Sequence, residues 1–87
     1  MTSLDRDIKT FILRALLAAK DSPMTDDAIK AALRNAFAHV AFTAAEITDH
    51  VKACEESNLI AGNNDEVFGL MWALTPKGKI RALNLPR

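Results

Sequence analysis

The sequence predicts a single α+β domain that is mainly α: three helices, then a two-stranded β-hairpin, then a short C-terminal helix. Two patterns of apolar residues support this class. Up to about residue 57, apolar residues recur at intervals of about three or four positions, as on one buried face of a helix. From residue 68 to residue 74 they recur at every second position, as on one buried face of a strand. A chain of 87 residues, 49% of them hydrophobic, has room for one small core.

The first two helices are expected over about residues 4–20 and 25–38. In the first, a stripe of leucine, isoleucine and phenylalanine continues until the segment before Pro23, and proline disfavours helical geometry at the residue that precedes it. In the second, the hydroxyl of Thr25 can cap the helix, and two aspartates occupy the first turn, where the helix dipole favours negative charge. The end of this helix is the least defined boundary, because residues 38–42 contain no glycine or proline.

The third helix is expected over about residues 43–57, because Thr43 and Glu46 have the spacing of a capping box. The β-hairpin is expected over about residues 59–75. Turn-forming residues fill positions 62–65, G-N-N-D, between its strands. We therefore expect a long, flexible tip rather than a tight two-residue turn.

The second strand of the hairpin carries the aromatic residues Phe68 and Trp72 on one face, together with Leu70 and Leu74. Aromatic side chains can stack on the bases of single-stranded nucleic acid. Since the alternation places both aromatics with two leucines, we expect them to be buried in the core instead.

The last helix is expected over about residues 76–84. Thr75 can cap it, and Pro76 suits the first helical position, because the N–H that proline lacks has no helical partner there. Its apolar contribution to the core is expected from Ile80, Leu83 and Leu85.

The closing segment carries the most specific pattern of the chain. Residues 72–79 are W-A-L-T-P-K-G-K, which resembles the W-x-L-T-x-x-G-[KR] closing motif of many bacterial proteins in the winged helix-turn-helix superfamily. Residues 55–60, E-E-S-N-L-I, are similar to the L-E-E-x-G-L-I end of that superfamily's third helix. Cys54 replaces the leucine and Asn58 replaces the glycine. Asparagine is the next best residue for a left-handed helix end, so we expect that conformation at Asn58.

This resemblance covers nearly the whole chain and implies a winged-helix fold. An inward aromatic and a leucine, here Trp72 and Leu74, would seal the hairpin onto the helices, and Thr75 would cap the last helix. In DNA-binding members of the superfamily, the third helix enters the major groove and the hairpin, or wing, touches phosphate. A fold does not determine a function, so this use has to be weighed against the charge of the chain.

The distribution of charge disfavours DNA binding by the third helix and wing. The formal net charge is 0, from 11 basic and 11 acidic residues. Residues 43–66 hold one basic and six acidic residues, a net charge of −5, whereas residues 67–87 hold four basic residues and no acid, a net charge of +4. Residues 1–42 have a net charge of +1. The surface expected to meet DNA is acidic, and phosphate would be repelled there.

We therefore expect a small regulatory or protein-interaction module that uses the acidic third helix and wing on a protein partner or on a second copy of the chain. The alternative is a DNA-binding transcriptional regulator of the winged-helix type; an acidic face that serves only solubility is a third interpretation. The expected protein-binding face consists of Glu46, Asp49, His50, Ala53 and Glu56. Under the alternative, the nucleic-acid contacts would be His50, Lys52, Asn63, Asn64, Lys77, Lys79 and Arg81.

No catalytic, cofactor or metal site is expected. His50 and Cys54 are four residues apart on one helical face, the spacing of a metal-ligand pair, and Asp49 or Glu46 could add a third ligand. Cys54, however, belongs to the apolar stripe, so a structural role is favoured. A catalytic thiolate needs an electropositive, accessible site, whereas the charge around Cys54 is negative. The glycines form no phosphate-binding loop.

The start of the chain predicts its location. Met1 is followed neither by a basic stretch nor by an apolar core, the pattern of a signal peptide, and no apolar run approaches the ~18 residues that span a bilayer. We expect a cytoplasmic protein with no membrane contact and no small-molecule substrate. Because Met1 leads directly into the first helix, we also expect a whole protein rather than a piece of a larger one.

Overall fold

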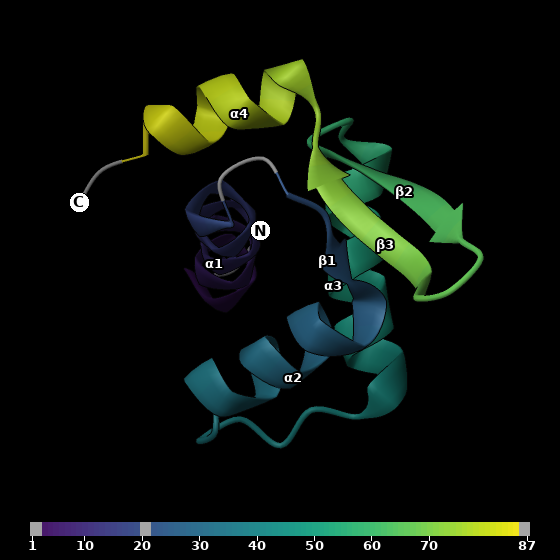
Figure 1. The fold of residues 1–87 in the computed structure, drawn as a ribbon. Helices are drawn as coiled ribbons and strands as arrows, with labels where there is room; N and C mark the ends of the chain where they lie inside the picture. The colour runs from purple at the N-terminus through teal and green to yellow at the C-terminus, as the bar shows by residue number, and fades with distance from the viewer. Residues whose placement is uncertain (1–2, 20–21, 86–87) are drawn as a thin grey trace.

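A computed structural model describes residues 3–19 and 22–85, and in these ranges it contains four helices and a three-stranded antiparallel sheet (Figure 1). This confirms the mainly helical α+β class. The helices are α1 (Ser3–Ala18), α2 (Asp26–Ala36), α3 (Ala44–Glu56) and α4 (Pro76–Leu83). The strands are β1 (Met24–Thr25), β2 (Ile60–Asp65) and β3 (Gly69–Leu74).

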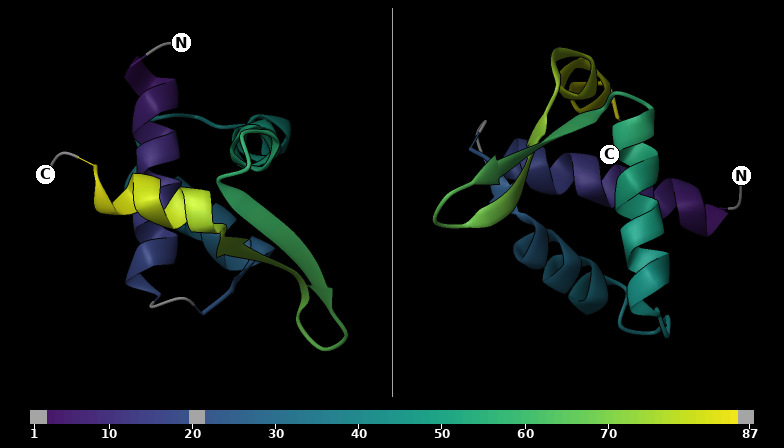
Figure 2. Two further views of the ribbon diagram at one scale, coloured as in Figure 1. Left: turned by 90° about the horizontal axis from the view of Figure 1, so that it is seen from above. Right: turned by 90° about the vertical axis from the view of Figure 1, so that its right-hand side faces the viewer.

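Helix α1 lies at the centre of the packing. It contacts each of the other three helices and strand β3, and Figure 2 shows it passing between α4 on one side and α2 on the other. Its buried stripe of leucine and isoleucine meets the apolar faces of α2 and α3 and the base of the hairpin. The buried core residues are Ile8, Ile12, Leu13, Leu16, Ile29, Leu33, Ile47, Val51, Cys54, Leu59, Ile60, Trp72 and Ala82.

The helix starts follow the expected capping residues. The Thr25 hydroxyl accepts a hydrogen bond from the Ala28 N–H at 3.1 Å, which satisfies a donor that has no helical partner.

Helix α2 ends at Ala36, two residues before the expected end, and Phe37 caps it. Helix α1 ends at Ala18, whereas its expected end, Lys20, lies outside the described residues.

Strand β1 was not expected, because a two-residue segment has no alternation to detect. It pairs with the edge of β3 opposite β2, so that the sheet order is β1-β3-β2 rather than a two-stranded hairpin. Met24 lies opposite Trp72 and Thr25 opposite Met71. The short strand covers only the Met71–Trp72 part of this edge of β3 and leads directly into α2.

The hairpin turn has three residues, so it is not a two-residue turn, as expected, but the expectation that residues 62–65 form a long tip is wrong. Those residues belong to β2, and Asp65 pairs with Gly69. The turn is residues 66–68. One carboxylate oxygen of Asp65 accepts hydrogen bonds from the N–H groups of Val67, at 2.7 Å, and Phe68, at 2.9 Å. Gly69 then adopts a φ of +76°, which favours glycine.

The end of α3 has the left-handed conformation expected at Asn58, whose φ is 60°. The Leu59 N–H donates to the Cys54 carbonyl at 3.0 Å, and the Asn58 N–H donates to the Glu55 carbonyl at 2.9 Å. This pair of bonds is a Schellman motif, which satisfies carbonyls at the end of the helix and turns the chain into β2.

Helix α4 begins as expected but packs on the core through a different face. The Thr75 hydroxyl accepts from the Gly78 N–H at 3.0 Å and donates to the Asn58 carbonyl. The expected inward positions of Ile80 and Leu83 are wrong, because these side chains are 63% and 64% exposed. The helix instead packs through Gly78 and Ala82, since a glycine lets its backbone lie against Leu59.

Candidate interaction surfaces

Glu46 belongs to the cap of α3. Its carboxylate accepts from the Thr43 N–H at 2.9 Å, and the Thr43 hydroxyl accepts from the Glu46 N–H at 3.1 Å. The predicted capping box is therefore present. The hydrogen bond from the Thr43 backbone, followed by that from its side chain, lowers the pKa of Glu46. Its negative charge is thus held at the first turn of α3, where the helix dipole also favours it.

The solvent side of α3 is acidic over its whole length. Asp49, Ala53 and Glu56 are exposed, as is Glu46 at the start of the helix. We call these four residues the α3 face. Lys52 is exposed beside them and is the one basic residue of the helix. Four of the five residues expected on the protein-binding face thus lie in solvent.

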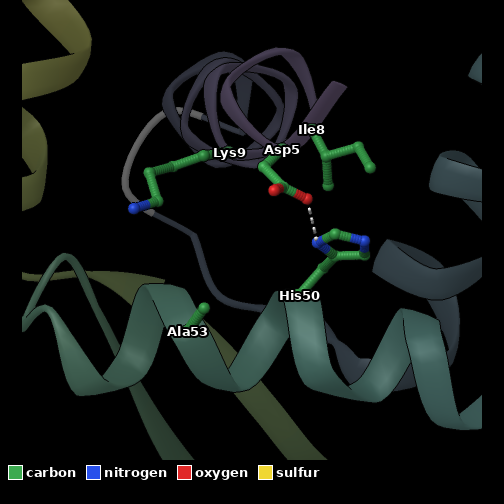
Figure 3. Close-up of a pocket in the computed structure, with 5 residues that line it drawn as sticks. All are labelled: Asp5, Ile8, Lys9, His50 and Ala53. Atoms are coloured by element: carbon green, nitrogen blue, oxygen red, sulfur yellow. Dashed lines mark ion pairs between the residues drawn. The ribbon is translucent and has the colours of Figure 1, made fainter. Parts of the chain in front are cut away.

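His50, the fifth, lies in a hollow between α1 and α3 (Figure 3), which Asp5, Ile8, Lys9 and Ala53 line with it. Its Nδ1 atom is 3.9 Å from an oxygen of Asp5. The imidazole ring also meets Phe42 edge to face, with ring centroids 5.9 Å apart. The sequence placed His50 on α3 correctly, but its position in the hollow depends on how α1 crosses that helix.

A cleft lies on the other side of α3, between this helix, the start of α2 and the hairpin. Val51, Leu70 and Trp72 contribute its apolar wall. The Trp72 Nε1–H donates to Asp26 at 2.9 Å, and Lys30 pairs with the same carboxylate at 2.8 Å. Burial raises the pKa of Asp26, but the hydrogen bonds from Lys30 and Trp72 and the positive charge of Lys30 together outweigh it and lower that pKa.

The hairpin tip, which we define as Glu66, Val67 and Phe68, presents apolar side chains to solvent. Val67 is 80% exposed and Phe68 is 66% exposed. The prediction that Phe68 is buried is wrong, whereas Trp72, on the same strand face as Leu70, is buried as expected. Figure 2 shows the reason: the hairpin projects beyond the helices, so no element covers its end.

The residues proposed for nucleic-acid contact do not form one surface. His50 faces the α1 hollow, and Lys52 lines the cleft. Asn63 and Asn64 are successive residues of β2, so their side chains point to opposite faces of the sheet. Lys77 donates to the carbonyl of Ser57 at 3.0 Å, at the end of α3. The last two of the set, Lys79 and Arg81, lie farther along α4.

The possible metal ligands do not converge. Cys54 is buried in the core, and this burial raises the pKa of its thiol although Lys9 acts in the opposite sense. Within residues 3–19 and 22–85, no three histidine, cysteine or carboxylate side chains lie close enough together to hold a metal ion. None of the helices in those ranges is long and apolar enough to cross a membrane.

Comparison with known proteins identifies no related protein. The chain matches no protein-family model, no curated protein and no solved structure closely enough to show a relationship. The resemblance to winged-helix proteins therefore rests on the residues of this chain alone.

Proposed function

We propose that the chain is a small regulatory or protein-interaction module of the winged-helix type, which binds a protein partner through the α3 face and the hairpin tip. The order of its helices and hairpin supports this type. So do the contacts of its closing segment: Trp72 is buried, Thr75 caps α4, and Gly78 lies against the backbone of Leu59.

The exposed apolar tip carries the proposal. Val67 and Phe68 stand on a turn that the Asp65 carboxylate holds through two hydrogen bonds, so their backbone is already ordered before any partner binds. A backbone that is already ordered loses less entropy on binding. Phenylalanine is also among the residue types enriched at the core of protein–protein interfaces.

The acidic residues of the hairpin and of α3 favour a protein over DNA. Asp65 and Glu66 accompany the apolar pair on the hairpin, and the α3 face adds Glu46, Asp49 and Glu56. Most of the salt-dependent affinity for DNA comes from lysine and arginine at the phosphates, and the hairpin has neither between residues 60 and 74. The complementary partner has an apolar pocket for Phe68 with basic residues around it, because opposite charges speed association and align the two surfaces.

Photo-crosslinking in cells that produce the chain tests this surface directly. Benzoyl-phenylalanine replaces Phe68 in one variant and Asp49 in another. Ala36, which is exposed at the far end of α2, carries it in a matched control. We expect irradiation to give protein adducts from positions 68 and 49 and none from position 36.

Two results would contradict the proposal. One is the absence of protein adducts at positions 68 and 49. The other is micromolar binding of a labelled random duplex, measured by fluorescence polarisation, that disappears as salt is raised. Loss of that binding in the Lys77→Glu, Lys79→Glu double variant, with little change in Lys52→Ala, would establish the DNA-binding alternative through α4.

A further inference from the structure

A second exposed apolar patch lies on α4. Ile80 and Leu83 are three residues apart, so they share one side of the helix, and both are more than half exposed. Leu83 also lines a hollow between α1 and α4 with Leu17 and Leu85, which extends the apolar surface toward α1. We call Ile80 and Leu83 the α4 patch.

The charges around the α4 patch are opposite to those around the hairpin tip. Lys77, Lys79 and Arg81 lie on α4, and residues 67–85 contain no acidic side chain. The tip carries Glu66 and adjoins Asp65, and residues 43–66 have a net charge of −5. Each patch therefore combines an apolar pair with charges that complement the other patch.

We propose that the partner of the hairpin tip is a second copy of this chain, whose α4 patch receives Val67 and Phe68. This inference rests on the proposed function, because it names the occupant of the same surface. The aromatic ring of Phe68 packs on Ile80 and Leu83 of the neighbouring copy. Glu66 then faces the lysine and arginine side chains of α4 in that neighbouring copy. Burial of these apolar side chains supplies the attraction, and the charges fix the orientation.

The two patches of one copy cannot satisfy each other. Figures 1 and 2 show the hairpin projecting from one side of the molecule, while the C-terminal end of α4 lies on the opposite side. A contact between two different surfaces leaves one free patch at each end of a pair. Such head-to-tail association continues to longer chains or closes into a ring, rather than stopping at a two-fold dimer.

The expected affinity is low. A three-residue turn against an eight-residue helix covers much less than the ~1,600 Å² of a standard protein interface, so the association belongs to the transient class. Because exposed charges contribute, it should also weaken as the salt concentration rises.

Analytical ultracentrifugation with two complementary variants tests this arrangement. One carries Val67→Ser and Phe68→Ser, which removes the tip; the other carries Ile80→Ser and Leu83→Ser, which removes the α4 patch. All four side chains are exposed, so both variants are expected to fold, and circular dichroism checks this. Ala36→Ser, on the exposed end of α2, is the matched control.

The proposal makes a specific prediction for each sample. The mean mass of the wild-type chain and of the control rises with concentration beyond that of a dimer, and each variant alone stays monomeric, with association weakened at least tenfold. An equimolar mixture of the two variants forms dimers and nothing larger, since each contributes one intact patch.

Three outcomes would overturn it: a wild-type chain that remains monomeric up to about millimolar concentration, a mass that saturates at the dimer, or a mixture that stays monomeric. The proposed function is judged separately, by the crosslinks at position 68. Adducts with a different protein, together with a monomeric wild-type chain, would retain the proposed function and reject self-association.

Discussion

The two ends of the β2–β3 hairpin are built differently. At the base, Thr75 binds the Asn58 carbonyl, Lys77 binds the Ser57 carbonyl, and Gly78 lies against Leu59. At the tip, the Asp65 carboxylate holds the turn while Val67 and Phe68 extend into solvent. The base therefore joins the end of α3, the hairpin and the start of α4, and this stabilises the fold. The tip instead leaves apolar side chains available for binding. Substitutions at the base should therefore affect stability, and substitutions at the tip should affect association.

Trp72→Ala is expected to have the largest effect on stability. It removes a buried aromatic side chain and the hydrogen bond to Asp26, and loss of a core aromatic costs about 3–5 kcal/mol. The free energy of unfolding from urea denaturation measures this loss. Trp72→Phe keeps most of the apolar volume and is expected to lose less than half as much. An unchanged midpoint of urea denaturation in Trp72→Ala would contradict the conclusion that Trp72 packs the hairpin onto the core.

Gly78→Ala comes next. A methyl group at this position would lie 1.8 Å from the carbonyl oxygen of Leu59, which itself accepts the Thr75 N–H. Overpacking of this kind costs about 1–3 kcal/mol, and we expect the upper end, because a backbone atom cannot rotate away. Gly69→Ala, where the space is open but φ is +76°, is the control and should lose about 1 kcal/mol from its conformation alone.

Asn58→Ala tests the left-handed residue that turns α3 into the hairpin. Its φ of 60° is unfavourable for alanine by about 1–2 kcal/mol. Asn58→Gly should equal or exceed the wild-type stability, because glycine adopts this conformation without a steric penalty. Thermal unfolding of the alanine and glycine variants measures this difference in stability. Equal melting temperatures for the alanine and glycine variants would show that the conformation at residue 58 contributes nothing.

The Asp26 carboxylate should make stability depend on pH. Its pKa is lower in the folded protein than its ordinary value of 3.8, since the hydrogen bonds from Lys30 and Trp72 and the charge of Lys30 together outweigh burial. The stabilisation is therefore complete above that ordinary value and is lost as the pH falls through the folded pKa. Asp26→Asn should flatten the fall in stability below about pH 4. Asp27→Asn, an exposed neighbour, is the control, and an equal flattening there would contradict this role.

Local signals explain why so much of the fold was predictable. Thr25, Thr43 and Thr75 each mark a helix start, because a capping hydroxyl acts within three residues of its own position. The left-handed turn at Asn58 is equally local. Strand β1 escaped prediction because it exists only where the edge of β3 is available to pair with it.

The surfaces were harder to predict, because exposure depends on which elements lie nearby. Alternation correctly put Leu70 and Trp72 on one face, but it could not show that the helices cover only the base of the hairpin. The same limit applies to His50, which the crossing of α1 places in a hollow, and to Ile80, which α4 turns outward. The exposure of Asp49 and Glu56 could be predicted without knowing the neighbouring elements, since both lie opposite the buried stripe of α3.

Phe68→Ser should have the smallest effect on stability and the largest effect on association. Its ring is mostly exposed, so its removal is expected to change the free energy of unfolding by less than about 0.5 kcal/mol. The Asp65 carboxylate binds the backbone N–H of residue 68, so the turn should persist in the variant. Urea denaturation and sedimentation of the same sample separate the two effects. A loss of stability comparable to that of Trp72→Ala would mean that Phe68 is part of the core, and the distinction between base and tip would fail.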